Sequence, residues 1–249
     1  MIELQNIHKV FNKGEVNEVH ALNDVSLTIQ QGEYLVLVGS NGSGKTTLLN
    51  IISGAEIVTS GKVLFNNDDV TKLPEHRRSK WIARVFQNPL SGTAAELSIL
   101  DNFRLAALRT TSKKPIIGVN PAFKKQVQER IATLGMGLEN KVEQAMGTLS
   151  GGQRQALTLL MSVMDHTDIL LLDEPTAALD PRSAETILKT ADALIKEYKL
   201  TAVLITHNLK DAHQYGNRII QMAEGKILKD INSGAKSKLQ LPDLFAWFS

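Results

Sequence analysis

Short apolar runs separated by longer amphipathic stretches dominate the pattern of this chain. Apolar runs at 34–38 and 169–172 are typical of strands that are buried on both faces, and the β-branched run at 201–206 predicts a further strand. Residues 2–10 and 21–29 instead alternate between apolar and polar side chains, which favours antiparallel strands with one exposed face. The pattern therefore predicts a buried parallel sheet and a half-exposed antiparallel sheet.

Amphipathic stretches with a helical period occupy much of the remaining chain. Helices are expected at 98–109, 121–134, 150–164 and 181–198, with a turn or two of helix at 74–79. Further short strands are expected at 61–65, 81–86, 219–222 and 226–231. Since strands alternate with helices, we predict an α/β fold built on a parallel sheet, with a helical insertion.

We expect one domain over residues 1–249 that consists of a core with an antiparallel β subdomain, a helical subdomain and a C-terminal tail. Its core with the antiparallel β subdomain takes residues 1–88 and 161–231, the helical subdomain takes 89–160, and the C-terminal tail takes 232–249. Because the tail is rich in apolar residues, we interpret it as a short amphipathic helix packed on its own domain. A dimer or regulatory contact is the lesser alternative.

Composition narrows the class of protein. The chain has 249 residues, of which 43% are hydrophobic and 22% are charged, as is usual for soluble globular proteins. It has no cysteine, which excludes disulfides and thiolate chemistry. Its net charge of +2 is too small to favour nucleic acid as a partner. Since no window approaches about 18 uninterrupted apolar residues and no basic–apolar leader pattern opens the chain, we expect neither a transmembrane helix nor a signal peptide.

The strongest chemical signal follows the apolar run 34–38. It reads Gly39-Ser40-Asn41-Gly42-Ser43-Gly44-Lys45-Thr46-Thr47, and a helical pattern follows. A strand, this glycine-rich spacing and a helix form a phosphate-binding loop, or P-loop, whose N–H groups face the anion. Lys45 would add a full positive charge for the phosphates, and the Thr46 hydroxyl is a suitable Mg²⁺ ligand. The alternative is a glycine-rich turn that binds nothing.

An acidic pair ends the apolar run 169–172. Asp173 at the end of a buried strand is placed to hold Mg²⁺, usually through water, beside a P-loop. Glu174 follows directly, so on an extended chain its side chain would point to the opposite face. That placement suits a general base that polarises an attacking water. A plain acidic strand end is the alternative.

A second anion site is indicated where the helical stretch 150–164 begins. The sequence there is Leu149-Ser150-Gly151-Gly152-Gln153. Ser150 can cap the helix and the glycines expose N–H groups, although an ordinary N-cap would look the same. This segment matches the signature of ATP-binding cassette (ABC) ATPases, and the chain resembles that family over nearly its whole length.

The resemblance implies a P-loop NTPase fold with a RecA-like core, an antiparallel β subdomain and an inserted helical subdomain. It implies ATP and Mg²⁺ as cofactors and two copies of the chain in a head-to-tail dimer. In this family the signature of one subunit, here 150–153, closes over the γ-phosphate held by the P-loop of its partner. Two ATP molecules are thereby sandwiched between the subunits.

Four more residues match family positions. Gln87 resembles the glutamine that senses Mg²⁺ and the attacking water, and His207 resembles the switch histidine that contacts the γ-phosphate. Asp180 lies in a segment, 178–181, that looks like the loop linking the two sites across the dimer. Phe11 stands where the family stacks an aromatic ring on adenine, with simple core packing as the alternative. The resemblance thus implies Glu174, His207, Gln87 and Lys45 as catalytic residues and Thr46, Gln87 and Asp173 as the Mg²⁺ site.

The resemblance also implies a transport role. The chain looks like the ATPase subunit of a transporter with a separate permease, whose coupling helix would meet residues 87–109. Segments 85–93 and 206–212 look like a bacterial importer branch tied to aromatic amino-acid uptake or to no known substrate. That branch implies a substrate-binding lipoprotein and a location at the cytoplasmic face of the cell membrane. An exporter subunit or a soluble ABC ATPase without a transport role is the alternative.

Two clusters of basic residues complete the pattern. They are His76-Arg77-Arg78 and Lys113-Lys114. We interpret both as solvated surface charge, with contact to lipid headgroups as the alternative.

Overall fold

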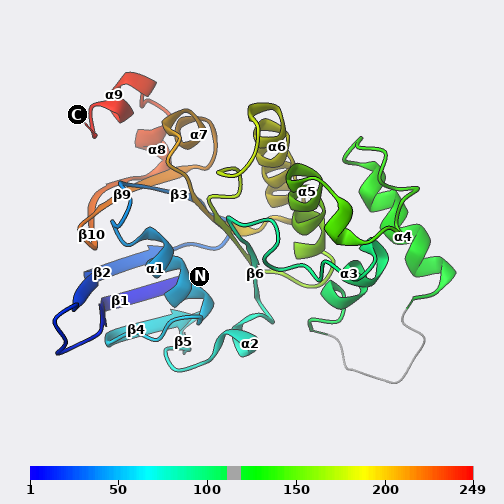
Figure 1. Ribbon diagram of the computed structural model, residues 1–249. Helices are drawn as coiled ribbons and strands as arrows, with labels where there is room; N and C mark the ends of the chain where they lie inside the picture. The colour runs from blue at the N-terminus through cyan, green and yellow to red at the C-terminus, as the bar shows by residue number, and fades with distance from the viewer. Residues whose placement is uncertain (111–118, 249) are drawn as a thin grey trace. The chain divides into compact units, whose positions relative to one another are not determined.

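The computed structural model of this protein describes residues 1–110 and 119–248. The chain forms two compact units, one made of Met1–Ser79 with Lys199–Ser249 and the other of Lys80–Tyr198. Sheet dominates the first unit and helix the second (Figure 1). Lys113 and Lys114 lie outside the described residues. Within the described ranges, no helix is both long and apolar enough to cross a membrane.

The first unit contains the predicted antiparallel sheet. Its strand order is β2-β1-β4-β5, with β1 at Ile2–Phe11, β2 at Val19–Ile29, β4 at Ser60–Phe65 and β5 at Asp68–Asp69. Buried and exposed residues alternate along much of β2, as expected for a sheet with one solvated face. The prediction of half-buried antiparallel strands is therefore confirmed.

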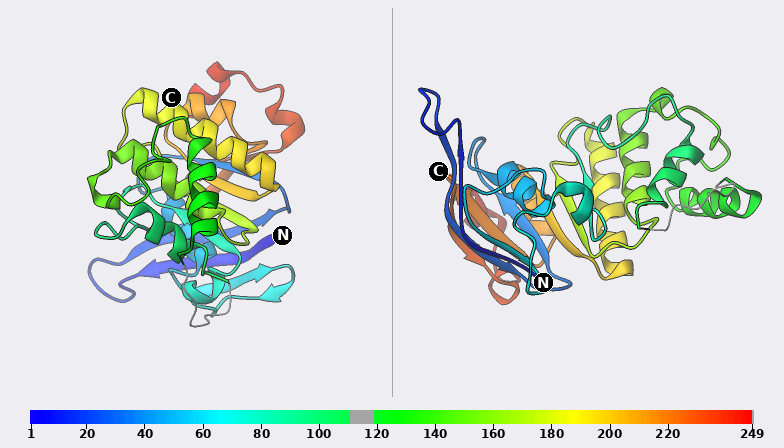
Figure 2. Two further views of the ribbon diagram at one scale, coloured as in Figure 1. Left: turned by 90° about the vertical axis from the view of Figure 1, so that its right-hand side faces the viewer. Right: turned by 90° about the horizontal axis from the view of Figure 1, so that it is seen from below.

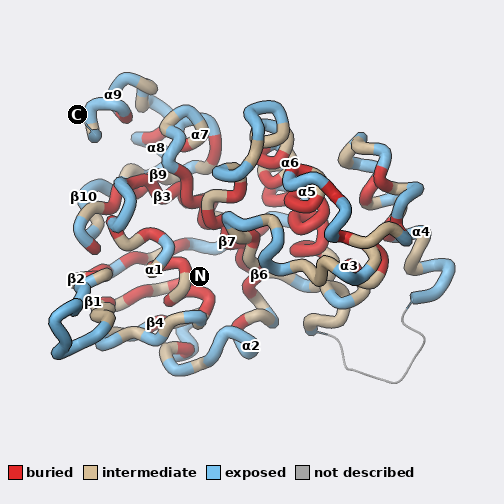
Figure 3. The backbone as a smooth tube through the Cα atoms, in the orientation of Figure 1, coloured by how far each residue is buried: buried red, intermediate tan, exposed pale blue. Residues whose placement is uncertain are grey.

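The first unit also contains a parallel set of strands. In the order β10-β9-β3-β8, β3 pairs in parallel with both neighbours and β10 pairs antiparallel with β9. These strands are β3 at Tyr34–Val38, β8 at Thr201–Ile205, β9 at Arg218–Ala223 and β10 at Lys226–Ile231. Every residue of β3 and β8 is buried, and β3 is red in Figure 3. Their apolar runs thus have the burial that the sequence predicts.

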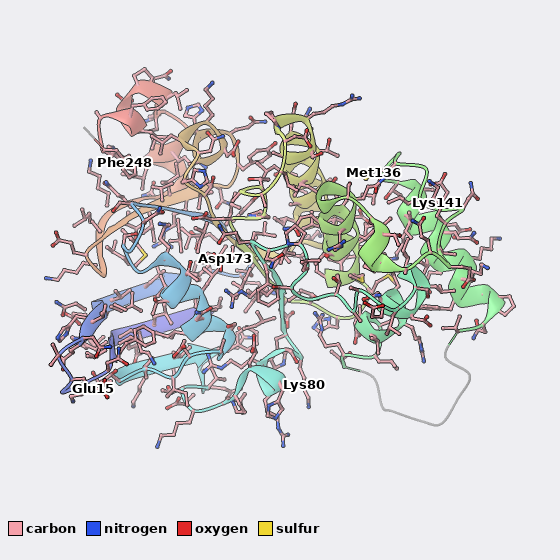
Figure 4. The ribbon with its side chains drawn as sticks, in the orientation of Figure 1. Glu15, Lys80, Met136, Lys141, Asp173 and Phe248 are labelled. Carbon is pink, nitrogen blue, oxygen red and sulfur yellow. The ribbon has the colours of Figure 1, made fainter. Side chains whose placement is uncertain are left out.

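Five short or medium helices belong to the first unit. They are α1 at Lys45–Ser53, α2 at Glu75–Arg78, α7 at Leu209–Gln214, α8 at Ser233–Lys236 and α9 at Leu241–Phe245. The predicted amphipathic helix of the tail is α9, which contacts α7 and buries Leu244 completely. Phe245 and Phe248 stay partly exposed on the tail (Figure 4).

The second unit pairs two parallel strands and surrounds them with helices. Its elements are β6 at Ile82–Val85, β7 at Ile169–Asp173, α3 at Ile99–Ala106, α4 at Pro121–Ala132, a 3₁₀ turn at Met146–Thr148, α5 at Gly151–Ser162 and α6 at Pro181–Tyr198. Ser98 and Asn120 cap α3 and α4, and Pro121 opens α4. The helices α5 and α6 lie side by side in both views of Figure 2.

Arg78 departs from the predicted surface charge. Its side chain is only 2% exposed, and its guanidinium donates five hydrogen bonds to backbone carbonyls. Two acceptors, Ile51 and Ile52, lie in the last turn of α1, where carbonyls lack helical partners. Burial lowers the pKa of Arg78 to about 10, so it remains charged at pH 7. The guanidinium therefore caps the helix that begins at the P-loop.

Arg78→Met should lower the free energy of unfolding by about 3 kcal/mol, because it leaves buried carbonyls without a donor. Urea unfolding followed by circular dichroism measures this change. Arg77→Met is the matched control, because Arg77 is exposed and lies beside Arg78 on α2. Its effect should stay within about 0.5 kcal/mol. Equal stability of the two variants would contradict the capping role.

Candidate nucleotide-binding site

The P-loop connects β3 to α1 in the first unit. Gly44 has φ +98°, and a Cβ there would lie 2.6 Å from the carbonyl oxygen of Ala21. Only glycine fits this left-handed, crowded position. The N–H groups of Gly42 and Gly44 meet no acceptor among the described residues. The loop therefore presents backbone donors of the kind that bind phosphate.

Lys45 lies within this loop. It is 5% exposed, and its ammonium donates to the carbonyls of Gly39 and Ser40 at 2.9 Å each. Thr46 is exposed in the first turn of α1, and that turn contains no acidic residue among the described ones. A cation, exposed N–H groups and a helix N-terminus without negative charge together fit a polyphosphate.

The first unit contributes two further predicted residues. Phe11 ends β1 and is half-buried, outside the buried core, and the ammonium of Lys9 lies 4.6 Å from its ring centre. His207 is exposed between β8 and α7, where Asn208 caps α7 by accepting from the N–H of Lys210. The interpretation of Phe11 as pure core packing therefore loses support.

The acidic pair belongs to the second unit. Asp173 is the last residue of β7 and is 6% exposed (labelled in Figure 4). Arg84 donates from Nη2 to Asp173 Oδ2 at 2.6 Å. Glu174 has φ +45°, so the expectation that the chain stays extended through it is wrong. The strand ends at Asp173, and a left-handed turn, unusual for a non-glycine residue, sets the direction of Glu174.

Gln155 joins the segments around Gln87 and Glu174, a role that the sequence analysis missed. Its amide is buried and donates to the carbonyl of Phe86 at 2.9 Å and to that of Pro175 at 3.0 Å. Each acceptor is the immediate neighbour of a predicted catalytic residue. Gln155 thereby links α5 to the exposed Gln87 segment after β6 and to the Glu174 turn after β7. In the sequence, the signal for this contact is no stronger than a polar residue in a helical stretch, and the structure shows that most of this helix, α5, is buried.

The predicted signature opens α5. Ser150 and Gln153 form a reciprocal capping box, with Gln153 N donating to Ser150 Oγ at 3.3 Å and Ser150 N to Gln153 Oε1 at 3.1 Å. This arrangement confirms the predicted N-cap. In the described part of the chain, the N–H groups of Gly151 and Gly152 meet no acceptor, so they suit an anion.

Close packing explains why the signature has a glycine at position 152, and the segment 178–181 lies beside the signature. A Cβ on Gly152 would lie 2.9 Å from Ser183 Oγ, so α5 approaches the start of α6 without a side chain between them. Asp180 accepts from the N–H groups of Arg182 and Ser183 at 3.1 and 3.0 Å. Hydrogen bonds from Ser183 lower the pKa of Asp180.

The donor set fits Mg²⁺ delivered with a nucleotide. The described residues contain no cluster of three His, Cys, Asp or Glu side chains that could hold a metal alone. Mg²⁺ is usually held by one or two protein oxygens, waters and substrate phosphates. Asp173 in the second unit and Thr46 in the first unit each offer one oxygen donor of this kind.

Comparison with known proteins shows the family. The model of the ABC transporter family matches residues 22–177. The chain therefore belongs to the ABC transporter family, as one of its ATP-hydrolysing cassettes.

Individual relatives cover the whole chain. A tyrosine transport ATP-binding protein of Clostridioides difficile is 33% identical over 100% of this chain and 98% of its own length. A phosphonates import ATP-binding protein of Lactococcus lactis subsp. lactis is 30% identical over 98% of each chain. A solved dimeric ATP-binding cassette in a post-hydrolysis state bound to ADP and Pi has a TM-score of 0.80 at 29% identity, covering 94% of this chain and 99% of that one. These similarities confirm the predicted α/β fold of P-loop NTPases.

Gln155→Leu should lower kcat for ATP hydrolysis by about tenfold with little change in KM, because small displacements of positioned groups reduce turnover. Steady-state phosphate release measures both constants. The matched control is Gln128→Leu, because Gln128 also donates to a backbone carbonyl, that of Glu139 at 3.0 Å, in the same unit. The positioning role fails if the two variants hydrolyse ATP at the same rate.

Proposed function

We propose that this chain is the ATP-hydrolysing subunit of an importer, acting as a head-to-tail dimer on a separate permease. The signature segment carries this proposal. Ser150 caps the helix α5, and the N–H groups of Gly151 and Gly152 meet no acceptor among the described residues. These N–H groups would form a second anion site besides the P-loop. One nucleotide needs only one P-loop, so a second anion site on the same chain is best explained by a phosphate held on another copy.

Each proposed role follows from the chemistry of a residue. Lys45 and the N–H groups of the P-loop would bind the β- and γ-phosphates, with Phe11 against the adenine. Thr46, Gln87 and Asp173 would hold Mg²⁺, which supplies positive charge to the phosphates when bound. The remaining roles lie with residues that act on the attacking water and the γ-phosphate.

Glu174 would accept the proton of the attacking water, since a carboxylate beside a strand end can act as general base. His207 and, from the partner copy, the signature residues Ser150 and Gly152 would contact the γ-phosphate. Asp180 would link the two sites across the dimer. When hydrolysis removes these contacts, the closed dimer loses its preference over the open one, and the opening would drive the permease.

The direction and class of transport are supported by the relatives. Those described above are a tyrosine transport and a phosphonates import ATP-binding protein, and a methionine import relative from Pseudomonas entomophila is 30% identical over 92% of this chain. We favour amino-acid import, with a substrate-binding lipoprotein outside the membrane and this subunit bound peripherally at the cytoplasmic face. The substrate itself would be selected by those partners.

Glu174→Gln should reduce kcat by roughly 10²–10³-fold, the size of a general-base contribution, while ATP affinity stays within about threefold of wild type. Phosphate release and the binding of a fluorescent ATP analogue measure the two quantities. With ATP, this variant should elute as a dimer in size-exclusion chromatography. The same change at Glu197, exposed on α6, is the control. Near-wild-type turnover in Glu174→Gln would falsify the general-base assignment.

Purification of the tagged protein from its own membranes in gentle detergent tests the transport role. Co-purification of a multi-span permease and a substrate-binding lipoprotein is the expected result. A permease that exports its substrate from vesicles would contradict the import direction. Ribosomal or DNA-associated proteins without a permease would overturn the transport role and leave the ATPase intact.

A further inference from the structure

Arg84 is a charged residue within the short strand β6. It lies opposite Leu171 in the parallel register of β6 and β7, two residues before Asp173 on the neighbouring strand. Its side chain is only 11% exposed, and its guanidinium lies 4.7 Å from the ring centre of Phe86. The aromatic face and the strand register hold the guanidinium at the end of β7.

The partner at that position is the carboxylate proposed to hold Mg²⁺. Arg84 Nη2 and Asp173 Oδ2 are 2.6 Å apart, and the two side chains are 11% and 8% exposed. This is a nearly buried, charge-assisted hydrogen bond, which is stronger than a surface ion pair. Without Mg²⁺, Arg84 therefore supplies a positive charge and a hydrogen-bond donor to this nearly buried carboxylate.

We propose that Arg84 is a positioning residue that holds Asp173 in place and weakens the hold of the site on Mg²⁺. The inference rests on the proposed role of Asp173. Arg84 would share the carboxylate with the metal and would set how strongly nucleotide binding depends on Mg²⁺. It would act on the metal through Asp173 and would not contact ATP.

Two effects predict that Arg84 lowers the affinity for Mg²⁺. First, a fixed guanidinium beside the carboxylate repels a divalent cation, which lowers Mg²⁺ affinity. Second, Arg84 stabilises the metal-free carboxylate, so Mg²⁺ gains less by binding it. Both effects disappear when Arg84 is replaced by a neutral side chain. Mg²⁺ should thus bind more tightly after the replacement.

Because Arg84 borders a cavity, we expect a variant with a neutral side chain at this position to fold. Arg84 borders a cavity of about 190 Å³ whose lining includes the polar side chains of Asn102, Thr158 and Ser162. A cavity of this size with polar groups in its lining has room for water, so shortening Arg84 leaves space that water can fill. Arg84→Met keeps the unbranched stem against Phe86 and removes the charge.

The test measures the dissociation constant of a fluorescent ATP analogue in EDTA and in Mg²⁺, for wild type and for Arg84→Met. The ratio of the two constants reports the Mg²⁺ contribution independently of turnover. Arg84→Met should raise this ratio by about tenfold or more, since a nearly buried charge a few ångströms from a cation is only weakly screened by water. An unchanged or lower ratio would overturn the inference.

Three variants separate this result from a general structural effect. Arg84→Lys keeps the charge but loses the stacked guanidinium, so its ratio should lie between those of wild type and Arg84→Met, and a rise as large as that of Arg84→Met would contradict the charge argument. Arg104→Met removes a guanidinium that lies 5.5 Å from the ring centre of Phe123 in the same unit, and it should leave the ratio unchanged. In an Asp173→Asn background, Arg84→Met should raise the ratio much less than it does in the wild-type background, because the shared carboxylate is gone and only the direct repulsion remains.

The same measurements distinguish failure of the inference from failure of the proposed function. If wild type does not bind the analogue, or if Asp173→Asn leaves the ratio unchanged, the proposed Mg²⁺ role of Asp173 is wrong. If Asp173→Asn lowers the ratio while Arg84→Met matches wild type, Asp173 keeps its role and Arg84 does not have the one proposed. If Arg84→Met does not fold, Arg84→Gln replaces it with the same expected rise.

Discussion

Burying a charged side chain is costly unless it is paired or hydrogen-bonded, and this constraint shapes the candidate site segments of each unit. The ammonium of Lys45 is held by two carbonyls of its own loop. The guanidinium of Arg78 holds the carbonyls at the far end of the same helix. Arg84 and Asp173 satisfy each other. Each of these pairings fixes a backbone segment or a rotamer on which the proposed chemistry depends.

The proposed catalytic residues share one structural origin, because each follows a buried parallel strand. The P-loop follows β3, Gln87 follows β6, Glu174 follows β7, which ends at Asp173, and His207 follows β8. Strands are held by ladder hydrogen bonds and packing, whereas the residues just beyond them are free to take special backbone conformations. Ligand sites at the carboxyl ends of strands are general for α/β sheets. The rigid strands therefore position loops that carry the function.

The second unit shows how a signature motif combines recognition with packing. The capping box of Ser150 and Gln153 sets the start of α5, while Gly152 allows α6 to approach closely. Further along the same helix, Gln155 reaches the backbone beside Gln87 and beside Glu174. A displacement of α5 would therefore be transmitted to both segments. Its buried amide joins α5 by hydrogen bonds to the segments beside the proposed catalytic residues Gln87 and Glu174.

By itself, the sequence determined the fold class, the P-loop, the strand ends that carry the acidic pair and His207, and the bounds of most helices and strands. These features depend on local periodicity and on motifs whose residues are adjacent in the chain. Only the tertiary structure decided the burial of Arg78, the pairing of Arg84 with Asp173, the left-handed turn at Glu174 and the links made by Gln155. These features depend on contacts between distant segments and on backbone angles, which residue order alone does not reveal.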